Sequence, residues 1–125
     1  MRIDDFLEIA EKISSRSDCR HKHGALLVSG GRIINSGHNR NKYCSFGQRF
    51  RGHGRGLATV HAEISAVLGV DRSKTAGSDL FVAREGRKLS KPCDMCIDVL
   101  RFVGISRVYY SMEDGFGVIN IKELE

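Results

Sequence analysis

Apolar residues recur along the chain at two spacings, and these spacings predict the order of helices and strands. Near the N-terminus they repeat every three or four residues, which is typical of an amphipathic helix over residues 3–15. The same pattern predicts a helix over residues 59–69, with Thr59 as its N-cap, and another over residues 93–103. Pro92 suits the first turn of the last helix. We therefore expect three main helices.

Short apolar runs between polar or glycine-rich segments predict the strands. Runs at 25–28 and 32–36 flank a Gly-Gly pair, which indicates a β-hairpin. Further runs predict strands at 80–83, 107–111 and 118–121. The last two lie about six residues apart, which is too short for a parallel crossover. They should therefore form an antiparallel hairpin.

The predicted elements follow the order α-β-β-α-β-α-β-β. Its strand-helix-strand-helix-strand core indicates an α/β sandwich in which some strands are parallel. The chain has 125 residues, the length of one ordinary domain, and it shows no internal repeat, linker or low-complexity segment. We expect a single domain over residues 1–125.

Composition narrows the class of protein. With 41% hydrophobic and 28% charged residues, the chain resembles a soluble globular protein, and no apolar run approaches the length of a membrane span. The N-terminus has no apolar signal core, so we expect a cytosolic protein. Four cysteines in that compartment should be reduced. The Cys-x-x-Cys pair then indicates metal binding or redox chemistry.

The net charge of +5 is concentrated in one segment between Gly37 and Gly56. The basic residues there, with no acidic residue among them, are Arg40, Lys42, Arg49, Arg51 and Arg55. Aromatic residues alternate with them at Tyr43, Phe46 and Phe50. Such a segment can bind a phosphate or stack the bases of single-stranded nucleic acid. It can equally be a solvated loop whose aromatic side chains pack into the core.

Two short motifs carry candidate chemistry, and each begins a predicted helix. His61 and the Cys93–Cys96 pair offer one imidazole and two thiolates, which suit zinc. A helix N-terminus favours the thiolate form of cysteine. A catalytic zinc keeps its fourth position for water and lowers the pKa of that water. Glu63, two residues after His61, could reach this water and transfer protons without binding the metal.

These motifs together resemble the signature of zinc-dependent deaminases. Over residues 3–121 the chain is similar to the cytidine deaminase-like superfamily. The similarity rests on His61-Ala62-Glu63, Pro92-Cys93-Asp94-Met95-Cys96, the 24–28 strand with Gly31-Arg32-Ile33-Ile34, and Gly37-His38-Asn39. It implies a three-layer α/β/α sandwich around a mixed five-stranded sheet. It also implies an oligomer of identical chains.

The resemblance assigns roles to individual residues. It makes His61, Cys93 and Cys96 the ligands of Zn²⁺ and Glu63 the proton shuttle. The backbone N–H of Ala62 would donate to the carbonyl of the base, and Asn39 would contact the sugar or the base. The expected reaction converts cytosine to uracil in a nucleoside, a nucleotide or a single-stranded polynucleotide.

Alternative functions remain open at this stage. The His ligand and the Pro-Cys-x-Met-Cys motif resemble the deoxycytidylate, guanine and tRNA-adenosine branches, so the base could be adenine or guanine. The short C-terminus, with a turn at Asp114-Gly115, resembles the free-nucleoside enzymes. A third hypothesis is a non-catalytic, nucleic-acid-binding module with a structural zinc, whose fourth ligand would be Cys19 or Cys44. A second metal site could use Cys19, His21, His23, Cys44 and His53.

Overall fold

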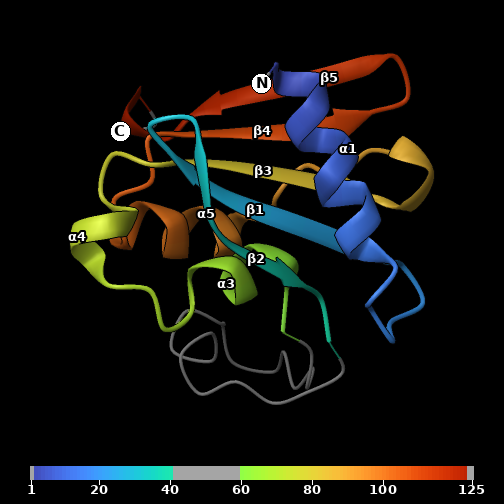
Figure 1. Cartoon of the computed structure of the whole chain (residues 1–125), viewed down its shortest axis with the longest axis horizontal. Helices are drawn as coiled ribbons and strands as arrows, with labels where there is room; N and C mark the ends of the chain where they lie inside the picture. Colours follow the sequence, from blue (N-terminus) through green and yellow to red (C-terminus); the bar gives the residue numbers. More distant parts are fainter. Residues whose placement is uncertain (1, 41–59, 124–125) are drawn as a thin grey trace.

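The computed structural model describes residues 2–40 and 60–123 (Figure 1). Its helices are α1 (Ile3–Ser14), α3 (Ala62–Val67), α4 (Arg72–Thr75) and α5 (Asp94–Phe102), with 3-10 turns at Glu85–Arg87 and Ile121–Glu123. Its strands are β1 (His23–Ser29), β2 (Arg32–His38), β3 (Asp79–Arg84), β4 (Arg107–Met112) and β5 (Gly115–Asn120). None of the helices in these two ranges has the length and apolarity that crossing a membrane requires.

The strands form one five-stranded sheet in the order β2-β1-β3-β4-β5. The β3–β4 pair is parallel, and α5 lies in the connection between these two strands. The β1–β2, β1–β3 and β4–β5 pairs are antiparallel. The predicted mixed sheet with an antiparallel C-terminal hairpin is therefore confirmed.

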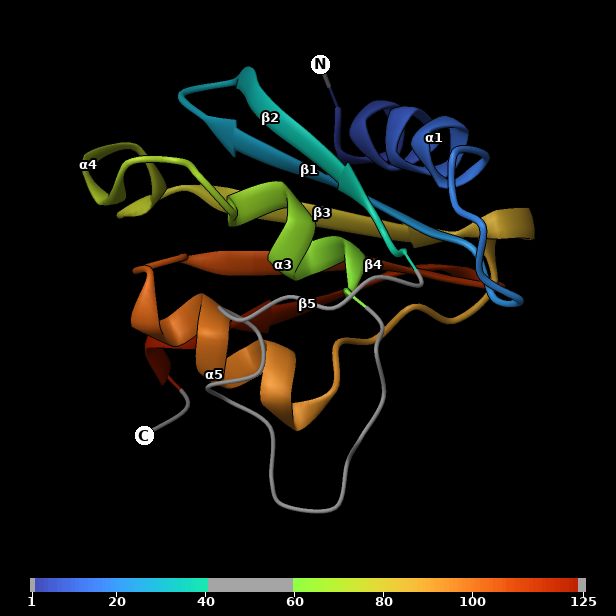
Figure 2. The same cartoon turned by 90° about the horizontal axis from the view of Figure 1, so that it is seen from below.

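Alternate side chains of the central strands pack against helices on opposite faces of the sheet. Leu26 and Phe81 lie in a cluster with Phe6 and Leu7 of α1. The next residue of β1, Leu27, lies in a second cluster with the apolar side chains of α3 and α5. Figure 2 shows α1 on one side of the sheet and α3 and α5 on the other. The predicted three-layer α/β/α sandwich is confirmed.

Helix α3 begins later than its sequence pattern indicates. Val60 pairs with Arg40 in an isolated antiparallel bridge, with N–O distances of 2.9 and 2.7 Å between their backbones. This bridge keeps the chain extended, and α3 begins at Ala62 with His61 as its N-cap. The prediction that Thr59 caps this helix is wrong, because a long-range backbone pair overrides the local helical pattern.

Two further elements differ from the predicted ones. Helix α4 lies between the predicted helix over residues 59–69 and the predicted strand at 80–83, where no element was expected, and its N-cap is Asp71, whose carboxylate accepts from the backbone N–H of Ser73 at 3.1 Å. Strand β5 begins at Gly115, three residues before the predicted start. Gly117 interrupts its apolar pattern, but a Cβ at that position would lie 2.2 Å from the ring of Tyr110. The strand therefore needs glycine there for packing.

A glycine allows α3 to lie close to the sheet. A Cβ on Gly37 of β2 would lie 2.5 Å from the backbone nitrogen of Ala66 in α3. The side chain of Asn35 also donates to the carbonyl oxygen of Ala66 at 2.8 Å. Close packing and this hydrogen bond together fix α3, and with it the segment that carries His61 and Glu63, against β2.

A pair of buried serines fixes the segment that leads into α5. The hydroxyl of Ser90 donates to the carbonyl of Val82 at 2.9 Å and accepts from the backbone N–H of Ser111 at 2.9 Å. The hydroxyl of Ser111 donates to the carbonyl of Lys88 at 2.6 Å and accepts from the backbone N–H of Arg84 at 3.1 Å. The two hydroxyls lie 2.9 Å apart. This network ties residues 88–90 to the ends of β3 and β4.

We predict that Ser111→Ala lowers the free energy of unfolding by about 1 to 3 kcal/mol, because the part-buried N–H of Arg84, the part-buried carbonyl of Lys88 and the buried hydroxyl of Ser90 lose this partner. Ser73→Ala, at an exposed position of α4, should change it by less than about 0.5 kcal/mol. Urea unfolding of both variants and the parent measures this difference. Equal stabilities of the two variants would contradict this role of the serine pair.

Candidate metal centre and active site

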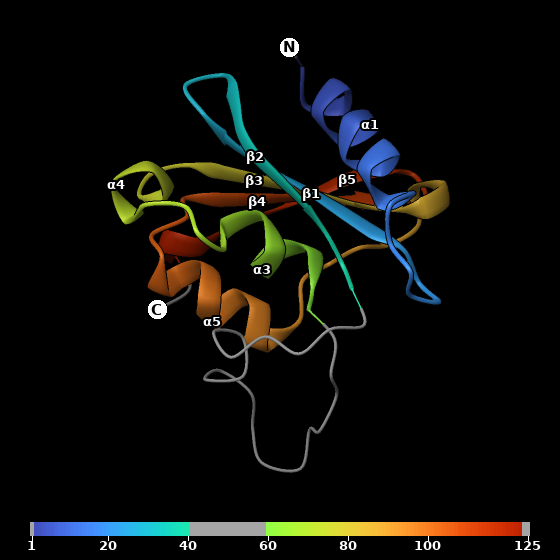
Figure 3. The ribbon, with the colours of Figure 1, turned by 60° about the horizontal axis from the view of Figure 1, so that its bottom comes forward.

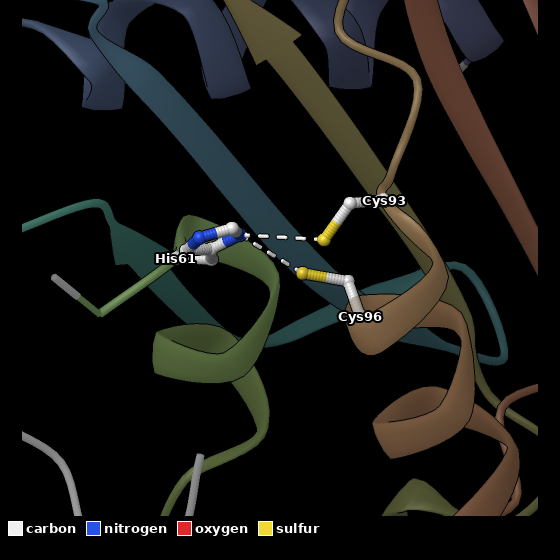
Figure 4. Close-up of side chains that lie close together, drawn as sticks. All are labelled: His61, Cys93 and Cys96. Carbon is white, nitrogen blue, oxygen red and sulfur yellow. Dashed lines mark hydrogen bonds between the residues drawn. The ribbon is translucent and has the colours of Figure 1, made fainter. Parts of the chain in front are cut away.

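Two helix N-termini bring the predicted metal ligands together. His61 is the N-cap of α3, Cys93 is the N-cap of α5, and Cys96 lies in the first turn of α5. Figure 3 shows α3 and α5 on the same side of the sheet. In Figure 4 the imidazole of His61 points toward both sulfur atoms. Residues separated by more than thirty positions thus form one cluster.

The spacing of the three donor atoms fits a zinc ion. Nδ1 of His61 lies 3.2 Å from Sγ of Cys96 and 3.8 Å from Sγ of Cys93, and all three donors lie within 4.8 Å of one another. A tetrahedral zinc with one nitrogen and two sulfur ligands separates such donors by about 3.6 to 3.8 Å. One imidazole and two thiols are also the donor types that zinc prefers. The cluster is therefore consistent with a Zn²⁺ site of three protein ligands.

The two cysteines differ in their protonation. The hydrogen bond with Cys96 lowers the pKa of Cys93 to about 3, and the same interaction raises the pKa of Cys96. The shared hydrogen bond thus favours the thiolate form of Cys93 and the protonated form of Cys96. Zinc binding requires both sulfurs as thiolates, so it would release the proton of Cys96.

Glu63 lies beside this cluster. Its side chain is 5% exposed, and burial raises the pKa of Glu63 above its ordinary value. The nearby His61 and a hydrogen bond with Cys96 oppose this shift. A raised pKa favours the protonated form, so the carboxyl group can donate a proton more readily than an exposed glutamate can. This environment gives Glu63 the properties that a general acid–base group needs.

A cavity of about 390 Å³ opens onto this cluster. It is lined by Cys19, Arg20, His21, His23, Asn39, His61, Ala62, Glu63, Ser90, Lys91 and Cys93. The cavity brings together the predicted ligands His61 and Cys93, the buried carboxyl of Glu63, and the predicted substrate-contacting residues Ala62 and Asn39. Its size is suited to a small molecule.

Asn39 lies on the cavity wall, but its side chain is held by the backbone. Its Oδ1 accepts from the backbone N–H of His23 at 2.9 Å, and its Nδ2 donates to the carbonyl oxygen of His21 at 2.6 Å. The amide group therefore fixes the segment that precedes β1. A direct contact between Asn39 and a substrate stays a prediction.

The residues considered for a fourth zinc ligand or a second metal site lie outside the His61-Cys93-Cys96 cluster or outside the described residues. Cys19, His21 and His23 line the cavity but are not part of the metal-binding cluster found in residues 2–40 and 60–123. Cys19 is therefore not placed as a fourth zinc ligand. Cys44 and His53 lie outside the described residues. The same is true of the basic segment apart from Arg40, so its binding of nucleic acid stays a prediction.

Sequence reasoning assigned no role to several residues of the cavity wall. Arg20 and Lys91 add positive charge, and Ser90 belongs to the buried serine pair. The place of Lys91 two residues before Cys93 could have indicated from the sequence that it lies at the cavity. Arg20 lies in a polar segment remote from both motifs, and its place at the cavity depends on how that segment folds back toward α3.

Comparison with known proteins places this geometry in a family. The family model for the cytidine and deoxycytidylate deaminase zinc-binding region matches residues 1–112. The deoxycytidylate deaminase of Mycobacterium phage D29 is 34% identical over 124 residues, covering 86% of this chain and 92% of the relative. A tRNA-specific adenosine deaminase of Agrobacterium fabrum is 31% identical over 98 residues, covering 75% of this chain and 53% of the relative.

Solved structures agree with this placement. The dCMP deaminase of cyanophage S-TIM5 has a TM-score of 0.65 at 27% identity, covering 88% of this chain and 84% of the other. Cytidine deaminase of Burkholderia pseudomallei has a TM-score of 0.72 at 21% identity, covering 99% and 96%, and shows that the fold is shared. Since the family model spans most of the sequence and the His-Cys-Cys cluster is in place, the chain belongs to the cytidine and deoxycytidylate deaminase zinc-binding family.

Proposed function

We propose that the protein deaminates cytosine in a nucleotide, with deoxycytidylate as substrate, water as co-substrate, and deoxyuridylate and ammonia as products. The observation that carries this proposal is a buried carboxyl beside a His-Cys-Cys cluster at one cavity. The relative from phage D29 is a deoxycytidylate deaminase, and the cyanophage S-TIM5 enzyme has been solved in complex with dCMP and dUMP. The latter structure has a TM-score of 0.62 at 27% identity.

His61, Cys93 and Cys96 would hold the zinc ion, which when bound supplies an activated water molecule as the nucleophile. Glu63 would take a proton from that water and deliver it to N3 of the cytosine ring as oxygen adds to C4. Glu63 would then transfer the second proton of the water to the exocyclic amine, which leaves as ammonia when the C4–N bond breaks. Glu63 is 5% exposed, so its carboxyl group has little contact with bulk water.

Ala62 would orient the base. It lies in the first turn of α3, where a backbone N–H has no acceptor within the helix. Ala62 also lines the cavity, so this N–H is suited to bind the carbonyl oxygen of cytosine. The neighbouring Glu63 would then face the ring position that reacts.

The charge of the cavity wall favours a phosphorylated substrate. Arg20 and Lys91 both line the cavity, and among the described residues that line it the only acidic side chain is that of Glu63. Two cations can bind a monophosphate, which a free nucleoside lacks. Self-association and a cytosolic location stay predictions from the sequence.

We predict that Glu63→Gln lowers kcat by about 10²- to 10⁴-fold, because it removes the group that transfers the protons. The variant should bind zinc as the parent does, since Glu63 is not among the three ligands. Glu8→Gln, an exposed change on α1, is the matched control and should keep full activity. Ammonia release together with zinc analysis measures both quantities. Normal turnover by Glu63→Gln would refute the proposed mechanism.

The substrate class is tested by mass spectrometry with the purified zinc-loaded protein. We expect deoxycytidylate to gain about one mass unit per molecule and to be turned over with a higher kcat/KM than deoxycytidine, because Arg20 and Lys91 can bind its phosphate. Single-stranded oligonucleotides and adenosine-containing tRNA loops are the competing substrates. Preference for a tRNA loop would support the adenosine branch instead, and preference for deoxycytidine would remove the role of the phosphate.

A further inference from the structure

His23 occupies the position where the apolar side of β1 ends at the cavity. Ala25 and Leu27, two and four residues further along the strand, pack in the core beneath α3 and α5. Since alternate residues of a strand share a face, His23 continues this row toward the cluster, and it lines the cavity. The imidazole of His23 thus lies next to the core residue Ala25 on this face of β1, and it lines the same cavity as Ala62 and Glu63.

The hydrogen bonding of His23 fixes which ring nitrogen carries the proton. Nδ1 lies 3.3 Å from the carbonyl oxygen of His21, and a carbonyl oxygen can only accept. Nδ1 is therefore the N–H donor, and Nε2 is a hydrogen-bond acceptor in the neutral ring. Burial lowers the pKa of His23, which keeps the ring neutral at physiological pH. Within residues 2–40 and 60–123, Nε2 has no hydrogen-bond partner.

The backbone around His23 is held from both neighbouring strands. Asn39, just past β2, bonds to the backbone of His21 and His23 as described above. From the side of β3, the backbone N–H of Glu85 donates to the carbonyl of Lys22 at 2.9 Å. Arg84 donates from Nη2 to Nδ1 of His21 at 2.7 Å, so the ring of His21 already has a partner. His23 is therefore presented to the cavity on a preorganised segment.

We infer that Nε2 of His23 accepts a hydrogen bond from the 3′-hydroxyl of the bound deoxynucleotide, and that His23 is a specificity-determining residue. This inference rests on the proposed function. A deoxycytidine monophosphate offers two kinds of hydrogen-bond donor, the exocyclic amine and the sugar hydroxyl. The amine is at the reacting carbon, next to Glu63, whereas N3, the base carbonyl and the ionised phosphate are acceptors. The hydroxyl is the donor that remains for an acceptor on the wall.

The experiment compares two substrates and four proteins. The substrates are deoxycytidylate and 2′,3′-dideoxycytidine 5′-monophosphate, which lacks the hydroxyl. The proteins are the zinc-loaded parent, His23→Leu without an acceptor, His23→Gln with an amide oxygen near the position of Nε2, and His21→Leu as the matched control. His21 is in the same segment, but its ring is bound to Arg84. Zinc content and the unfolding temperature of each protein establish that it is folded.

In the parent, loss of the hydroxyl should lower kcat/KM by roughly 2- to 12-fold, the range for one neutral hydrogen bond. The change should be in KM, with kcat altered by less than about twofold. His23→Leu should turn over both substrates with equal kcat/KM, whereas His23→Gln and His21→Leu should retain discrimination. A purely structural role of His23 would affect both substrates alike and leave their ratio unchanged.

Two results overturn the inference, and they can be told apart. If the parent is active on deoxycytidylate but shows no preference for the hydroxyl, or if His23→Leu keeps that preference, the inference fails and the proposed function stands. If the parent deaminates neither substrate, the proposed function fails and the inference with it. Should His23→Leu not fold, His23→Phe, which also lacks an acceptor, takes its place: equal kcat/KM for the two substrates supports the inference, and a retained preference for the hydroxyl overturns it.

Discussion

The approach of two helix N-termini on one face of the sheet is the constraint on which the rest of the site depends. His61 and Cys93 are the N-caps of α3 and α5, so the position of each helix sets the position of a zinc ligand. Neither helix is long, and α3 has six residues. Its orientation must therefore come from tertiary packing, because short helices are not stable alone. Gly37 and Asn35 of β2 supply that packing.

The position of α5 depends on a different set of contacts. Cys93 and Cys96 follow an irregular segment, which the hydroxyls of Ser90 and Ser111 attach to the ends of β3 and β4. The sheet thus holds α3 by close packing at Gly37 and the hydrogen bond from Asn35, and the segment before α5 by the hydrogen bonds of the serine pair. Glu63 is buried on α3, and burial raises its pKa, which is the property that the proposed proton transfer would use.

The sequence predicted those features that local spacing determines. His61 and Glu63 are two positions apart, and Cys93 and Cys96 are one turn apart, so their chemistry could be inferred without coordinates. The order of the main elements along the chain, the partly parallel α/β sandwich and the antiparallel C-terminal hairpin were also predicted from apolar periodicity and short connections, whereas the two layers of helices were implied by the family resemblance. The start of α3 was not predicted correctly, because the pairing of Arg40 with Val60 is a contact across twenty positions that no local pattern shows. The use of the Asn39 side chain as a backbone clamp was hidden for the same reason.

We infer that the zinc of this protein has three protein ligands and an open fourth position, and X-ray absorption at the zinc edge of the loaded protein tests this coordination most directly. We expect one zinc per chain with two sulfur neighbours at about 2.3 Å, one imidazole nitrogen, and one further light atom at about 2.0 Å that cyanide or another small ligand replaces. Three sulfur neighbours, or a fourth ligand that no small molecule displaces, would contradict it. That result would identify a structural zinc and leave Glu63 without a catalytic role.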